Sequence, residues 1–94
     1  MNEIQGLEKK LTIKNKLGMH ARAAALFVQT ANQFESDITI GKDAQEVNAK
    51  SIMGILILAA ACGSEVIVKA KGADALEALD AIENLIERRF DEEE

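Results

Sequence analysis

His20 is the only histidine of the chain, and its side chain can take part in more kinds of chemistry than any other in the sequence. It follows the turn-forming segment 15–18 and directly precedes a run of helix-forming residues, so we expect it at the start of a helix. First-turn N–H groups lack intrahelical acceptors and lie at the positive end of the helix dipole, where an anion is stabilised. The same positive end favours the neutral imidazole, which keeps a lone pair for attack on phosphorus. At this position His20 could hold a phosphoryl group.

The neighbours of His20 are suited to hold that phosphoryl group. Arg22 carries a planar guanidinium fork that matches phosphoryl oxygens, and the amides of Ala21, Arg22 and Ala23 belong to the first helical turn. Gly18 permits a close approach of the chain. Position alone is compatible with a plainer role, because a lone histidine at a helix start is more often a surface or capping residue.

Other residues offer less chemistry. Cys62 ends an apolar segment without a nearby charge to activate its thiol, so we expect a small buried residue rather than a nucleophile. Gly41-Lys42 is no phosphate-binding P-loop, since Ser36 stands where the first glycine is needed. One cysteine and one histidine do not make a transition-metal site, and we expect neither a metal nor a cofactor.

Hydrophobic periodicity predicts the elements that position these residues. Alternation at period two predicts strands over residues 10–14, 37–41, 45–49 and 65–71. Helical spacing predicts helices over 21–34 and from 74 to Phe90. The run 52–61 is apolar on almost every side and could be a short helix or a buried strand, and its alanine-rich end favours a helix. Ser51 is a suitable N-cap for the second helix and Gly63 a suitable stop, while Asp74 and Glu77 resemble a capping box for the third.

The resulting order, βαββαβα, is an α+β arrangement that leaves two folds open. One is a four-stranded antiparallel sheet with three helices on one face, and the other is a ferredoxin-like split βαβ with an added helix.

Length and charge limit the function. The 94 residues suit one domain, 1–94. A net charge of −5 argues against a nucleic-acid binder, and the acidic residues 91–94 are predicted to form a solvated end. The longest apolar run, 52–62, is too short to span a bilayer, so we expect no membrane insertion. A lone cysteine is typical of a reducing compartment and favours the cytoplasm.

Two separate segments carry a resemblance to a known family. Asn15-Lys16-Leu17-Gly18-Met19-His20-Ala21-Arg22-Ala23-Ala24 closely resembles the active-site segment of the HPr family, the histidine-containing phosphocarriers of the bacterial phosphoenolpyruvate:sugar phosphotransferase system. Lys50-Ser51-Ile52-Met53-Gly54 is similar to the regulatory serine region of that family. The resemblance covers almost the whole chain, and βαββαβα is the order of the family's open-faced sandwich.

The resemblance implies a carrier rather than an enzyme with its own turnover. His20 would take a phosphoryl group from enzyme I, which phosphoenolpyruvate charges, and pass it to the IIA domains of sugar permeases, with Arg22 as phosphate partner. One departure concerns Ala23, where the family usually has proline. Because proline would fix φ there in advance, we expect an altered rate or phosphoryl stability without loss of function.

The resemblance also assigns roles to the second helix. Ser51 would be phosphorylated by a dedicated ATP-dependent kinase, the HPr kinase/phosphorylase, although an N-cap role, worth about 1 kcal/mol, explains the serine equally well. Ile52, Met53 and Leu56 would form an apolar patch against which partners dock. We expect a monomer.

Two other functions stay open at this point. A ferredoxin-like module that binds a small regulatory ligand would share the element order, but it would not require His-Ala-Arg at a helix start. A nitrogen-branch paralogue of the family (NPr) would use the same His20 for regulation. The segment 50–54 favours the serine-regulated type, and phosphorylation rates with each branch's enzyme I would separate the two.

Overall fold

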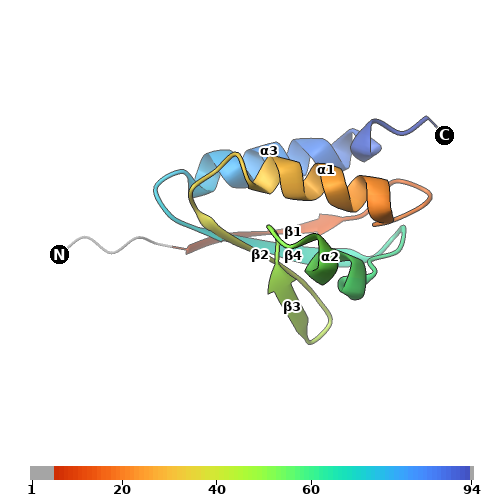
Figure 1. Cartoon of the computed structure of the whole chain (residues 1–94), viewed down its shortest axis with the longest axis horizontal. Helices are drawn as coiled ribbons and strands as arrows, with labels where there is room; N and C mark the ends of the chain where they lie inside the picture. Colours follow the sequence, from red (N-terminus) through yellow and green to blue (C-terminus); the bar gives the residue numbers. More distant parts are fainter. Residues whose placement is uncertain (1–5, 94) are drawn as a thin grey trace.

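The computed structural model describes residues 6–93, which build an open-faced sandwich (Figure 1). In chain order the elements are β1 (Gly6–Thr12), α1 (Ala21–Ala31), β2 (Asp37–Lys42), β3 (Gln45–Asn48), α2 (Ile52–Leu58), β4 (Glu65–Lys71), α3 (Ala75–Glu87) and a 3-10 turn, η1 (Arg89–Asp91). The four strands lie in the order β1-β4-β2-β3, and each neighbouring pair is antiparallel. This confirms the antiparallel sheet covered by helices on one face.

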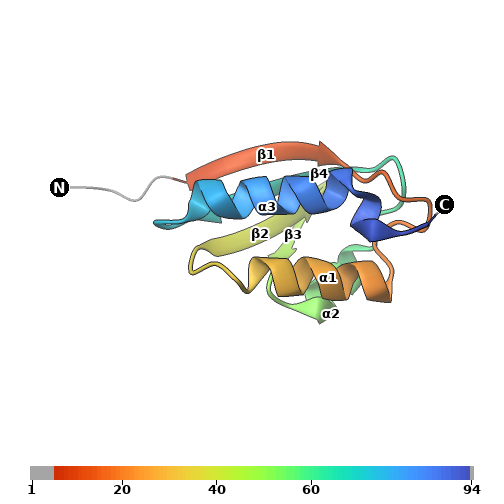
Figure 2. The same cartoon turned by 90° about the horizontal axis from the view of Figure 1, so that it is seen from above.

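Alternation along the strands separates the two faces of the sheet. The residues that point toward the helices are buried, and in the three longer strands they are Leu11, Ile38, Ile40, Val66, Val68 and Ala70. Helices α1 and α3 lie side by side over this face (Figure 2). Their own buried side chains, which include Phe27 and Ile82, complete an aliphatic core. No helix within residues 6–93 has the length and hydropathy needed to cross a membrane.

Glu83 interrupts the apolar face of α3, and the structure gives the reason. The Nζ of Lys9, on β1, donates to Glu83 at 2.6 Å and to Asp80 at 3.1 Å. Hydrogen bonds to Glu83 and then Asp80 raise the pKa of Lys9, so the amine stays charged. The polar position on α3 therefore ties the helix to the edge of the sheet.

The predicted helices exist, but all three end earlier than expected. Helix α3 ends at Glu87 rather than at Phe90, which lies in the separate turn η1. Helix α1 ends at Ala31 rather than at residue 34, and α2 ends at Leu58 rather than at residue 61. Ala59 closes α2 in the left-handed region, with φ 51°, so Gly63 is not the stop. The carbonyl of Ala60 then accepts the N–H of Met19 at 2.8 Å. A contact with the segment before α1, which local propensity does not report, sets where α2 ends.

The capping box predicted at Asp74 is wrong. Asp74 makes no side-chain cap bond to α3. Its carboxylate instead accepts from the N–H groups of Glu35 and Ser36, both at 2.9 Å, and from the Ser36 hydroxyl at 2.5 Å. The hydrogen bond from the Ser36 side chain, followed by that from the Glu35 amide, lowers the pKa of Asp74. Asp74 thus joins the start of α3 to the segment after α1.

The start of the first strand and the burial of Cys62 also differ from the predictions. The first strand runs over Gly6–Thr12 rather than residues 10–14. Cys62, expected to be buried, is exposed, because α2 ends early and the chain turns at the surface before β4. Its Sγ lies 3.7 Å from the carbonyl oxygen of Lys14.

Candidate functional site

His20 stands at the N-cap of α1, as the sequence predicts. Its backbone is extended (φ −84°, ψ −178°), and its carbonyl accepts the N–H of Ala24 at 2.8 Å, the first hydrogen bond of the helix. The His20 side chain does not cap the helix. The amides of Ala21, Arg22 and Ala23 therefore have no acceptor within the helix, and they form the positively polarised end that suits an anion.

The turn before His20 is fixed by Asn15 and Gly18. Gly18 has φ +68°, and a Cβ there would lie 2.8 Å from the carbonyl oxygen of Ala60, so only glycine fits. Asn15 is fully buried, and its Nδ2 donates to the carbonyl of Gly18 at 2.8 Å. Met19 is tied to Ala60 in the same place. These contacts fix the backbone from which the His20 ring projects.

The C-terminal segment reaches the histidine ring. The Nε2 of His20 hydrogen-bonds the carboxylate of Glu92, which lies 72 positions away in sequence. The Nδ2 of Asn15 donates to the same carboxylate, at 3.1 Å to Oε1 and 3.2 Å to Oε2. The Glu92 side chain is only 7% exposed. The expectation of a solvated acidic end is thus wrong for Glu92.

Electrostatics assign the proton in this contact. Burial raises the pKa of Glu92, but hydrogen bonds from His20 and Asn15 outweigh it and lower the pKa overall. The carboxylate is therefore ionised near neutral pH, and an ionised carboxylate can only accept. It follows that Nε2 of His20 is the donor.

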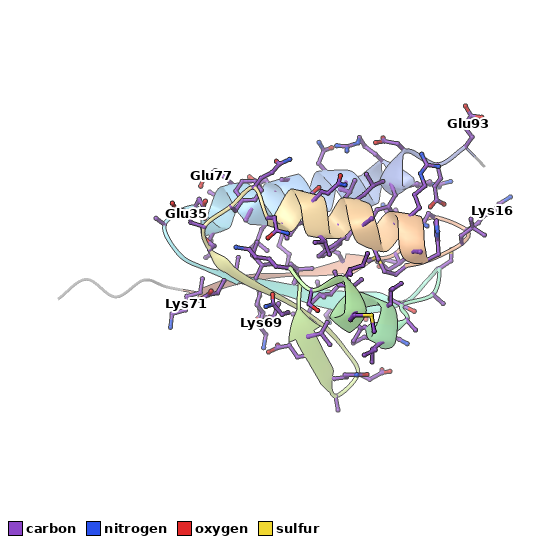
Figure 3. All side chains as sticks on the ribbon, viewed as in Figure 1. Lys16, Glu35, Lys69, Lys71, Glu77 and Glu93 are labelled. Atoms are coloured by element: carbon purple, nitrogen blue, oxygen red, sulfur yellow. The ribbon has the colours of Figure 1, made fainter. Side chains whose placement is uncertain are left out.

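An open pocket of ≈ 550 Å³ surrounds the exposed side of this ring. Its lining includes Lys16, Leu17, Arg22 and Glu92 together with His20. Figure 3 shows Lys16 projecting from the same end of the molecule as the C-terminal segment. Arg22 is exposed, and its charge also contributes to lowering the pKa of Glu92. The structure thus brings the predicted histidine and arginine together with an anion-favouring helix end.

Of the three residues predicted to bind phosphate through the first turn, only Ala23 is fully buried. Ala21 and Arg22 are exposed. Asn15, Leu17 and Glu92 were not singled out as site residues from the sequence. Leu17 is 71% exposed beside the pocket, a position that a large apolar residue in a turn could have signalled.

Helix α2 carries the other predicted residues. Ser51 is its N-cap, and the Ser51 Oγ accepts the N–H of Gly54 at 3.2 Å. Ile52, Met53 and Leu56 are 41%, 65% and 37% exposed, as a docking surface requires. Ile57, not predicted, is also exposed, at 62%.

Comparisons with known proteins agree with this geometry. Residues 7–88 match the PTS-HPr family, described as "PTS HPr component phosphorylation site". The phosphocarrier protein HPr of Xylella fastidiosa is 48% identical over 93% of this chain and 98% of its own length. A crystal structure of HPr from Thermoanaerobacter tengcongensis matches with a TM-score of 0.90 and 52% identity, over 94% of this chain and 99% of that chain.

A further structural match bears on the expected monomer. A crystal structure of an HPr dimer from Thermoanaerobacter tengcongensis has a TM-score of 0.75 and 50% identity, over 98% of this chain and 100% of that chain. The monomer therefore stays a prediction. A family match over most of the sequence, close relatives along nearly its full length and the shared fold lead to one conclusion: the chain belongs to the HPr family of phosphocarrier proteins of the phosphotransferase system.

Proposed function

We propose that His20 accepts a phosphoryl group from enzyme I and passes it to the IIA domains of sugar permeases. The observation that carries this proposal is the place of His20, at a helix N-cap whose first-turn amides have no intrahelical acceptor. Because Nε2 donates to Glu92, the lone pair of the neutral ring is on Nδ1. Nδ1 is therefore the nitrogen that attacks phosphorus.

The proposed transfer is a displacement at phosphorus. The lone pair of Nδ1 forms the new N–P bond while the bond from phosphorus to the phosphohistidine of enzyme I breaks, and its electron pair returns to the donor ring. The amides of the first turn receive the phosphoryl oxygens. Arg22, exposed at the edge of the same pocket, neutralises part of their charge.

Onward transfer repeats the displacement in reverse, with a nucleophile of the IIA domain attacking the phosphorus. The exposed side chains of Ile52, Met53 and Leu56 supply an apolar surface for both partners. The protein is then a substrate of two partners in turn and has no turnover of its own.

Ser51 is proposed as a regulatory site on this surface. A phosphate on its Oγ would stand at the N-terminus of α2, beside the exposed Ile52 and Met53. A dedicated kinase such as HPr kinase/phosphorylase would add it. The negative charge would weaken docking of enzyme I, which arrives with a negatively charged phosphoryl group.

Incubation with enzyme I, Mg²⁺ and phosphoenolpyruvate tests the proposal. The intact mass should rise by one phosphate that is stable in alkali and labile in acid, and His20→Ala should show no increase. Enzyme I of the sugar branch and enzyme I of the nitrogen branch are used in parallel reactions. The enzyme that phosphorylates the protein faster identifies its branch. No increase in mass with either enzyme would refute the carrier function.

A further inference from the structure

The end of the chain is built to hold one carboxylate against the histidine ring. After α3 the backbone enters the left-handed region at three consecutive residues, Arg89, Phe90 and Asp91, with φ between 56° and 57°. This turn is held by hydrogen bonds from Asp91 N to Arg88 O at 3.0 Å and from Glu92 N to Arg89 O at 3.1 Å. Three non-glycine residues adopt such φ values only where other contacts compensate for them.

Burial of Phe90 is the first compensating contact. Its side chain is fully buried within the core, although charged residues flank it on both sides in the sequence. The anchored ring fixes where the next two residues lie, so that Glu92 leaves the turn toward the start of α1. The position of Glu92 therefore follows from the fold.

The second compensating contact is the carboxylate itself. Glu92 bonds His20 through one oxygen and Asn15 through both, and its side chain is nearly buried. A carboxylate with so little access to water needs such partners. Asn15 also donates to the Gly18 carbonyl, so one amide joins the turn before His20 to the C-terminal segment.

The contact leaves the reacting side of the ring open. Glu92 bonds to Nε2 and not to Nδ1, and the first-turn amides have no acceptor within the helix. A carboxylate that competed with the phosphoryl group would occupy those amides. The geometry is that of a carboxylate–histidine pair, in which the carboxylate fixes the tautomer and orientation of the ring.

We infer that Glu92 is a positioning residue for phosphoryl transfer: it holds the proton on Nε2, directs the lone pair to Nδ1 and neutralises the ring as the N–P bond forms. The inference rests on the proposed carrier function of His20. The charges balance, because Nε2 keeps its proton throughout and the ring becomes positive when Nδ1 bonds phosphorus. Glu92 faces that positive charge, and no proton has to leave.

Two matched variants test this role. Glu92→Ala removes the partner of Nε2, and Glu93→Ala removes the same charge from the adjacent residue, whose side chain points away from the body of the protein (Figure 3). We expect Glu92→Ala to accept phosphate from enzyme I at least about tenfold more slowly than Glu93→Ala, by analogy with the loss of a hydrogen-bond partner of a metal-ligating histidine. Glu92→Gln, which can still accept from Nε2 but has no charge, should lie between them.

A spectroscopic signal distinguishes a positioning role of Glu92 from a purely structural role. Protein labelled with ¹⁵N only in histidine, without an affinity tag, reports on His20 alone, since the chain has one histidine. In the unphosphorylated wild type we expect the proton on Nε2 to be visible and protected from exchange with water. That proton should persist in Glu93→Ala and be lost to exchange in Glu92→Ala, with both variants folded by circular dichroism.

The outcomes distinguish the inference from the carrier function. Equal transfer rates in the two alanine variants, or faster transfer in Glu92→Ala, would overturn the positioning role, as would an unchanged Nε2 proton in Glu92→Ala. A wild type that takes no phosphate would refute the carrier function, and the ring proton would still decide whether Glu92 sets the tautomer.

Discussion

Replacement of Ser51 separates its capping role from a regulatory one. The Ser51 Oγ makes one cap bond, to Gly54 N at 3.2 Å, and α2 has only seven residues. Loss of such a bond costs about 1 kcal/mol, so Ser51→Ala should lower the melting temperature by about 4–8 °C in a domain of this size. Ser51→Asp keeps an acceptor at the N-cap and suits the helix dipole, so its stability should stay close to that of the wild type.

Phosphorylation by enzyme I should respond in the opposite order. Asp at position 51 places a negative charge beside Ile52 and Met53, of which Met53 is 65% exposed, whereas Ala adds no charge. Ser51→Asp should therefore slow phosphorylation of His20, and Ser51→Ala should not. Salt should partly restore the rate of the Asp variant, because exposed charges about 10 Å apart are screened at 0.1 M.

The assay pairs thermal unfolding with initial rates of phosphate incorporation at low and high salt. Asn84→Asp is the matched control, since it adds the same charge at an exposed position of α3, which α1 separates from α2 (Figure 2). If Asp destabilises the protein as much as Ala does, the cap reasoning fails. If the Ser51→Asp variant accepts phosphate as fast as Asn84→Asp at low salt, Ser51 is a cap alone.

Three further predictions concern the site and its support. Arg22→Ala should slow phosphoryl transfer at least about tenfold. Because Arg22 is exposed, the same change should alter the free energy of unfolding by less than about 0.5 kcal/mol. Arg22→Lys should recover part of the rate, and unchanged rates in both variants would remove Arg22 from the site. Phe90→Ala should cost about 3–5 kcal/mol in urea unfolding, since the ring is fully buried, and a cost under about 1 kcal/mol would show that it does not anchor the chain end. Hydrogen bonds hold the pKa of Glu92 below its ordinary 4.5, so its contribution to stability is complete above that pH and is lost as the pH falls through the lowered pKa. The wild type should therefore exceed Glu92→Gln in stability near pH ~5.5, and the gap should narrow as the pH falls below 4.5. A gap that stays constant as the pH falls would contradict this assignment.

Local signals in the sequence were sufficient for much of the fold. Period-two alternation placed the strand at 65–71 with the bounds that the structure has, because one face of that strand is buried and the other is not. Gly18 followed by His20 and an alanine-rich run placed the histidine at the N-cap of α1, because turn and helix preferences act over a few residues.

These local signals could not predict contacts between residues that are far apart in the sequence. Asp74 and Glu77 are the residue types expected of a capping box, yet the Asp74 carboxylate accepts a hydrogen bond from Ser36, which is 38 positions away. The bond between Glu92 and His20 likewise joins residues that no periodicity relates. The one available clue was Phe90, a large apolar residue among charged ones, which had to be buried and thereby fixed the path of the residues after it.

The most direct test of the central claim is to identify which ring nitrogen of His20 bonds to phosphorus. Protein labelled with ¹⁵N in its one histidine and incubated with enzyme I, Mg²⁺ and phosphoenolpyruvate can be studied by ¹⁵N and ³¹P NMR in alkali. We predict that Nδ1 of His20 bonds to phosphorus while Nε2 does not. Ring signals that stay unchanged while phosphate is incorporated, or phosphorus bonded to Nε2, would contradict transfer at this site.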